Sequence, residues 1–145
     1  MSGAAPAPSA ADRYRRFLLG TAALVFVGTL VELALIGHYQ DWIQWVPFGL
    51  CALGLGAVAL VRFAPSPGRL GAARAALGAV GAGGLLGVYQ HFAHNLEFER
   101  EIRPGAALGE VLPEAVTGAS PLLASGVLIL AAALAYAATL WRDAA

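Results

Sequence analysis

Three histidines and two glutamates stand near the ends of apolar stretches, where their side chains could together bind a metal ion. They are Glu32, His38, His91, His94 and Glu97. Imidazole and carboxylate groups suit Zn²⁺, iron, Mn²⁺ or Cu²⁺, and helix bundles commonly build such sites from facing helices. His91-x-x-His94 places two imidazoles about one helical turn apart, so both could share one ion. A divalent metal site is therefore one hypothesis for this chain.

The same residues allow two other chemistries. Haem b is the less favoured cofactor, since His38 with His91 or His94 could supply axial ligands but all three stand near helix ends. A proton or ion relay could run through Glu32, Tyr39 and the histidines. The further polar residues near this cluster are Tyr39, Asp41, Gln90, Asn95 and Glu101. Polar and aromatic side chains are also ordinary at the ends of membrane helices, so a structural role is the competing interpretation.

The motifs of common enzyme classes are absent from the sequence. It has no GxSxG, P-loop, HExxH or CxxC pattern. Met1 is the only methionine, which disfavours a soft Cu(I) site. We therefore predict no catalytic residue. An enzyme acting on a lipid or quinone is the weakest alternative, and it would need an open apolar groove between the first and third apolar runs, next to Glu32.

Composition indicates that these residues belong to an integral membrane protein. The chain is 59% hydrophobic and 12% charged, with a mean hydropathy of +0.69. An ordinary soluble domain carries about 25% charged residues. The net charge is zero, so no basic surface suggests nucleic acid as a partner. The lipid bilayer is the expected environment.

Four apolar runs have the length of a membrane span, about 20 residues. They cover residues 16–37, 44–63, 70–93 and 121–141. We predict an all-α fold: a single four-helix transmembrane domain over residues 11–145, preceded by a disordered segment, 1–10. The third loop, 95–119, carries apolar residues at helical spacing, which predicts a short amphipathic helix bent near Pro113. Those residues are Leu108, Val111, Leu112 and Val116.

The arginines predict the orientation of the bundle. They flank the start of the first run, the second loop and the end of the fourth run: Arg13, Arg15, Arg16, Arg62, Arg69, Arg74 and Arg142. The positive-inside rule then places both termini in the cytoplasm and the first and third loops on the outer face. The absence of lysine from an Ala- and Gly-rich chain is typical of a GC-rich bacterial genome. We therefore expect a multi-pass protein of the bacterial inner membrane, with a periplasmic outer face.

Helical phase suggests that the polar residues converge at the outer end. Glu32 lies about 8 Å before the end of the first run, at 1.5 Å per residue, so it should face the bundle interior or a wet cavity. Gly83 and Gly87 form a GxxxG pattern that favours close helix packing. The residues that share a face of the third run are Gly83, Gln90, His94, Glu97 and Glu101. We expect this face to meet His38, Glu32 and Asp41.

Our main functional hypothesis is an accessory or scaffold subunit of a membrane system. Its polar His/Glu cap on the outer face would bind a membrane or periplasmic protein through the loop 95–119. The alternative is a metal- or haem-binding membrane protein that uses the Glu32, His38, His91, His94 and Glu97 cluster. A proton relay or a small lipid- or quinone-linked enzyme is the further alternative. Assembly of several copies is compatible with each.

Overall fold

Every regular element that the computed structural model describes, within residues 8–140, is helical. The elements are α1 (Ala10–Leu35), the short 3₁₀ turn η1 (Trp42–Trp45), α2 (Val46–Phe63), α3 (Pro67–Ile102), α4 (Leu108–Thr117) and α5 (Leu122–Leu140). Four segments are long and apolar enough to cross a membrane: α1, η1 with α2, α3 and α5. The predicted all-α, four-helix membrane bundle is confirmed.

The first helix begins earlier than its apolar run because of its cap. The Ser9 hydroxyl accepts a hydrogen bond from the Asp12 backbone, and the Asp12 carboxylate accepts one from Ser9, so α1 starts at Ala10 and not near Arg16. The helix ends at Leu35, and Gly37 then takes a positive φ of 68° that favours glycine. Most of the segment predicted to be disordered, residues 1–10, lies outside the described residues.

Helix α3 continues past its apolar run, 70–93, as the helical phase through Glu101 predicts, and it shortens the third loop. It continues to Ile102, so the predicted loop 95–119 begins inside a helix. Its 36 residues span about 54 Å, against about 30 Å for the hydrocarbon core of a bilayer. The helix ends at Ile102, and Arg103, with φ −134° and ψ 65°, has left the helical conformation that the following Pro104 disfavours. Helix α4 follows, with Pro113 inside it, as the amphipathic pattern predicts.

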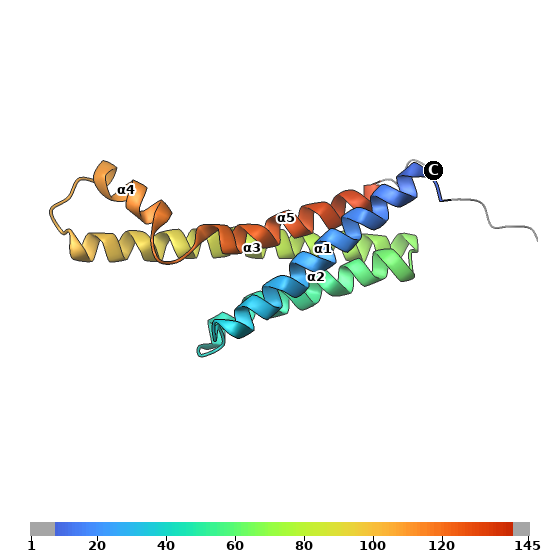
Figure 1. Cartoon of the computed structure of the whole chain (residues 1–145), viewed down its shortest axis with the longest axis horizontal. Coiled ribbons are helices and arrows are strands. Elements are labelled where there is room, and N and C mark those ends of the chain that lie inside the picture. The colour runs from blue at the N-terminus through green and yellow to red at the C-terminus, as the bar shows by residue number, and fades with distance from the viewer. Residues whose placement is uncertain (1–7, 141–145) are drawn as a thin grey trace, which may run out of the picture.

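The four long helices form a ring in which each packs against two neighbours. Helix α1 contacts α2 and α5, and α3 contacts α2 and α5, so α1 and α3 lie diagonally. Figure 1 shows α3 and α5 running side by side, with the α1–α2 hairpin crossing them at an angle. We call the end with Ala10, the 63–67 turn and Leu140 the terminal end. The opposite end, with residues 36–45 and 103–121, is the loop end.

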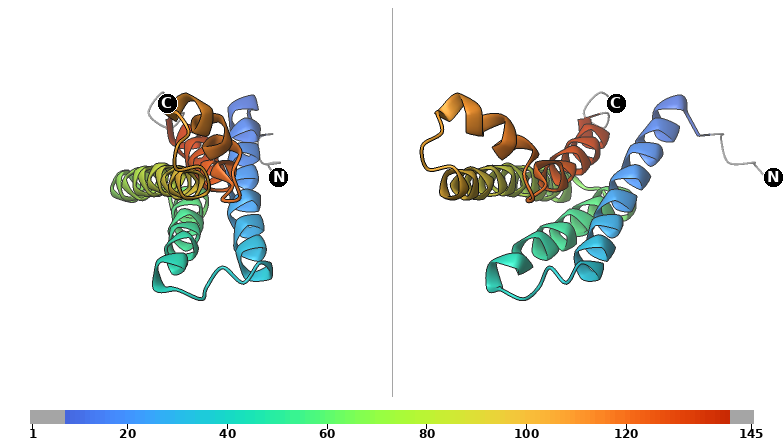
Figure 2. Two further views of the ribbon diagram at one scale, coloured as in Figure 1. Left: turned by 90° about the vertical axis from the view of Figure 1, so that its left-hand side faces the viewer. Right: turned by 60° about the vertical axis from the view of Figure 1, so that its left-hand side comes forward.

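The core of the four long helices is concentrated towards the terminal end. On α1 the buried residues are Leu19, Ala22 and Phe26, and none of α1 after Phe26 is buried. At that end the Arg74 side chain donates hydrogen bonds to the hydroxyl of Thr139 on α5, at 2.9 Å, and to the Thr139 backbone carbonyl, at 3.0 Å. Towards the loop end the hairpin diverges from α3 and α5, as Figures 1 and 2 show. This divergence leaves a cleft.

Candidate functional site: a cleft at the loop end

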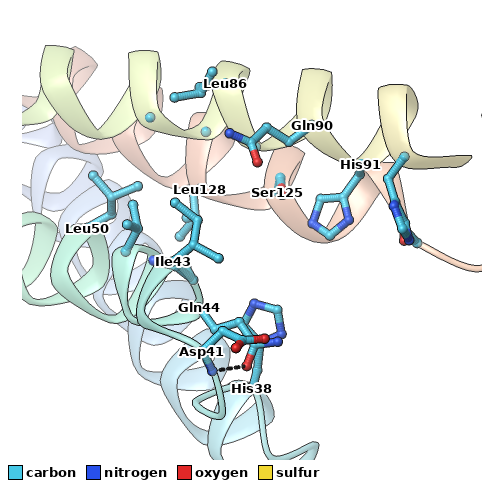
Figure 3. Close-up of a pocket in the computed structure, with 17 residues that line it drawn as sticks. His38, Asp41, Ile43, Gln44, Leu50, Leu86, Gln90, His91, Ser125 and Leu128 are labelled. Carbon is cyan, nitrogen blue, oxygen red and sulfur yellow. Dashed lines mark hydrogen bonds between the residues drawn. The ribbon is translucent and has the colours of Figure 1, made fainter. Parts of the chain in front are cut away.

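The cleft lies between the α1–α2 hairpin and the α3–α5 pair and has a volume of about 530 Å³. That volume is within the range of small-molecule sites. The hairpin contributes His38, Asp41, Ile43, Gln44, Val46, Pro47 and Leu50. The opposite side contributes Gly83, Gly84, Leu86, Gly87, Gln90, His91 and His94 of α3, then Ser120, Ser125 and Leu128. Figure 3 shows apolar side chains at one end of the cleft and imidazole, amide and carboxylate groups at the other.

The hairpin wall is shaped by the side chain of Gln44. Its Oε1 accepts a hydrogen bond from the backbone N–H of Gln40, at 2.8 Å. It accepts a second from the backbone N–H of Asp41, at 3.3 Å (Figure 3). These bonds hold the turn that leads into η1. Because the oxygen is used by the loop, the amide nitrogen of Gln44 remains as the donor end of this side chain.

Glycines let α3 approach both of its neighbours beside the cleft. A Cβ added at Gly83 would lie 2.6 Å from Cδ1 of Leu50, and one at Gly87 would lie 2.7 Å from Oγ of Ser125. Real Cβ atoms do not come this close, so with a larger residue at either place the Leu50 or Ser125 side chain, or its helix, would have to shift. The close packing predicted for Gly83 and Gly87 is confirmed. This close packing sets how near α3 lies to α2 and α5 beside the cleft.

The three histidines all line the cleft, from opposite walls. His38 extends from the hairpin, and His91 points from α3 towards it (Figure 3). His38 and His91 are half-buried and His94 is exposed. Within residues 8–140, none of these imidazoles has a hydrogen-bond partner in the chain. The cleft brings the histidines together with Asp41 and Gln90 but not with Glu32 or Glu97, and its imidazoles are polar groups that a bound molecule could satisfy.

Asn95 has a role that the sequence did not reveal. It is 3% exposed and sits under α4, where its Nδ2 donates to the carbonyls of Ala115, at 3.0 Å, and Ser120, at 2.9 Å. Its Oδ1 accepts from the Ser120 backbone N–H at 3.0 Å. Asn95 thus fastens the end of α4 and the start of α5 to α3. The available signal was its position on the flank of α3 shared with His91, but its partners lie 20 and 25 residues later.

Glu32 does not face the bundle interior, which corrects the prediction. It is exposed and does not line the cleft. It follows Phe26 by six residues, so it lies about 120° around α1 from the buried face. The lipid- or quinone-linked alternative would need a groove next to Glu32. The cleft lies instead between the hairpin and the α3–α5 pair, and Glu32 does not line it.

Besides Glu32 and Asn95, three members of the predicted cluster lie outside the cleft. Glu97 and Glu101 are exposed on the extension of α3, beyond the residues that line it. Tyr39 is exposed, and its ring lies 6.3 Å from that of Trp45. Across residues 8–140, no group of three or more His, Cys, Asp or Glu side chains could hold a metal ion. The structure therefore does not assemble the predicted five-residue ligand set.

Comparison with known proteins adds no family to this description. No protein-family model, curated protein or solved structure matches the chain. The fold and the cleft define a multi-pass helical membrane protein with a partly polar recess at one end of its bundle.

Proposed function

We propose that this protein binds a small amphipathic molecule of the membrane in the cleft at the loop end. The observation that carries the proposal is the pairing of two surfaces in one recess. Leu50, Leu86 and Leu128 supply an apolar part, and His38 and His91 supply polar groups without partners in the described chain. A molecule with an apolar tail and a polar head matches both parts at once.

Polar contacts decide which molecule would bind. A ligand that is already dissolved in lipid gains little from apolar burial, because acyl chains are as apolar as leucine. Hydrogen bonds formed in a low-dielectric recess are stronger than those made in water. Selectivity should therefore come from the histidines and from the amides of Gln44 and Gln90, with the leucines providing shape.

The proposal includes an orientation in a bacterial inner membrane, with both termini in the cytoplasm. Arg62, Arg69 and Arg74 flank the terminal end, which supports it. The loop end, where Arg103 is paired with Glu99 at 2.6 Å, would face the periplasm. A ligand would then enter the cleft from the outer leaflet.

The test uses two matched substitutions on α3. Leu86 lines the cleft and is 56% exposed, whereas Leu85 is 62% exposed and does not line it. The purified protein is mixed with equal amounts of phosphatidylethanolamine, phosphatidylglycerol, dioleoylglycerol and a decyl-substituted benzoquinone, and adducts are weighed by native mass spectrometry. We expect a 1:1 adduct in the wild type and in Leu85→Trp that falls at least about tenfold in Leu86→Trp, whose indole fills the recess.

Three results would overturn the proposal. The first is the absence of any adduct, and the second is equal binding by both variants. The third is a Soret band, or a stoichiometric metal in elemental analysis, that disappears in His91→Ala. That third result would make the protein a haem- or metal-binding protein, the alternative that the sequence offers.

An accessory role for the loop end is the second candidate function. It is favoured by the length of α3, whose extension with α4 stands clear of the other helices (Figure 1), and by a surplus of acidic residues there. The glutamates are Glu97, Glu99, Glu101, Glu110 and Glu114, against Arg100 and Arg103. A protein partner would present a basic surface. Exchanging Glu110 and Glu114 for Gln should then reduce the size of the complex on native gels of solubilised membranes, while leaving cleft binding unchanged; an unchanged complex would refute this role.

A further inference from the structure

We infer that the ligand's head group is an uncharged ring with carbonyl oxygens at two opposite edges, the chemistry of a quinone. The inference rests on the proposed function, because it names the class of molecule that the cleft would hold. Three observations support it: the hydrogen-bond donors on the two walls, the direction in which these donors point, and the absence of an arginine from the described residues that line the cleft.

Hydrogen-bond donors occupy both walls of the cleft. On the hairpin side, His38 lines the wall and Gln44 offers its amide nitrogen, since its oxygen is held by the Gln40 and Asp41 backbone. On the α3 side, His91 points across the cleft and Gln90 lies beside it (Figure 3). A neutral imidazole carries one N–H donor, and an amide carries two. A flat ring between the walls could accept a hydrogen bond from each side at once.

The charges of the cleft disfavour an anionic head group. Among residues 8–140 no arginine lines it, and the sequence has no lysine, so no permanently charged side chain of these residues is there to pair with a phosphate or carboxylate. Asp41 lines the recess, and Glu97 and Glu101 follow on the next turns of α3. An anion in the cleft would meet the Asp41 carboxylate without a fixed counter-charge. An uncharged head group can accept hydrogen bonds from the imidazole and amide donors without that charge repulsion.

The apolar part of the cleft suits a hydrocarbon tail. Leu50, Leu86 and Leu128 line the part of the cleft towards the middle of the bundle. Gly83 and Gly84 line it too, and they have no side chains to fill the space on the α3 side. Leu86 is 56% exposed, so the recess reaches the outer surface of the helices. A tail could leave along this side into the lipid while the ring stays between His38 and His91.

The test compares ligands that differ only in their head group. Native mass spectrometry measures the Kd of decyl-benzoquinone, of decylbenzene and of decyl phosphate for the full-length protein. We expect the quinone to bind at least about tenfold more tightly than decylbenzene, since two hydrogen bonds separate them. Decyl phosphate should bind more weakly than the quinone.

Substitutions then assign the two carbonyl contacts. His38→Leu and His91→Leu should each weaken quinone binding about three- to tenfold and leave decylbenzene binding unchanged. Tyr89→Leu is the control, because Tyr89 is exposed on α3 and does not line the cleft. A loss of folding would weaken both ligands equally, so the difference between ligands reports the contact itself.

The outcomes separate this inference from the proposed function. Equal affinity for decyl-benzoquinone and decylbenzene, or tighter binding of decyl phosphate, would refute the quinone inference. Cleft binding would still stand if Leu86→Trp removed the adduct of another lipid. Binding of none of the probes to the cleft would refute both.

Discussion

Removing the Asn95 side chain should release α4 from the bundle. Asn95→Ala deletes three hydrogen bonds, to the carbonyls of Ala115 and Ser120 and from the N–H of Ser120. At about 0.5–1.5 kcal/mol for each, the three bonds together contribute about 1.5–4.5 kcal/mol to holding the end of α4 and the segment before α5 against α3. Ala115 is near the end of α4, where carbonyls lack a partner within the helix, so nothing in α4 replaces the lost donor.

Hydrogen–deuterium exchange of the α4 amides measures this loss directly. Since 1.4 kcal/mol corresponds to a factor of ten, protection over residues 108–117 should fall by about 10- to 1600-fold. Amide protection in the buried halves of α2 and α5 should change little, because the only helix with which α4 makes substantial contact is α3. A fall in α4 protection of less than about threefold would refute the proposed role of Asn95.

A second substitution tests whether the effect runs through the asparagine. A Cβ at Gly118 would lie 2.7 Å from Cγ of Asn95, whereas nothing lies within 4 Å of a Cβ at Gly109. Gly118→Ala should therefore loosen α4 in the wild type and have a smaller effect once Asn95 is alanine. Gly109→Ala is the control, and it should leave α4 as protected as before or more so. Additive effects of the Asn95 and Gly118 changes would contradict this contact.

Three further predictions concern the packed half of the bundle. Gly54→Ala should lower the free energy of unfolding by about 1–3 kcal/mol, because the added Cβ would overlap the Phe26 ring. Gly56→Ala is the control, since open space surrounds Gly56, and it should leave that free energy unchanged. Denaturant titration of both variants measures the difference, and equal stability would refute the overlap. Cys51, which is 0% exposed, should react with a maleimide only after unfolding; rapid labelling of the folded protein would show that the core opens. Arg74→Gln should lower Tm by removing its two bonds to α5, and an unchanged Tm would mean that they contribute nothing.

Much of the fold could be predicted because a membrane-spanning helix must meet a requirement that is visible in the sequence. A span needs about 20 apolar residues with all backbone groups bonded internally, and this requirement is visible as length and hydropathy alone. The amphipathic helix α4 and the glycines Gly83 and Gly87 were equally visible, since helical spacing is a local property. Helical phase also indicated that the third helix reaches Glu101, but the start of the third loop was misplaced, because the hydropathy boundary near residue 93 precedes the helix boundary at Ile102.

The candidate site could be predicted only in part. Helical phase correctly grouped Gln90 with His94, because both lie on α3 and share its geometry. It failed for Glu32, since phase gives the angles between residues of a helix but not the side on which neighbours will pack. That side is set by Phe26 and the residues that precede it on the same face.

The sequence by itself determined the four spans, the short amphipathic helix and the polar character of one end of the bundle, because each depends on composition or on local periodicity. Only the tertiary structure decided that the hairpin diverges from α3 and α5, that the histidines face one another across the resulting cleft, and that Asn95 holds residues 20 and 25 positions away. Those features depend on helix crossing and on contacts between distant segments. Spacing along one helix carries no information about them.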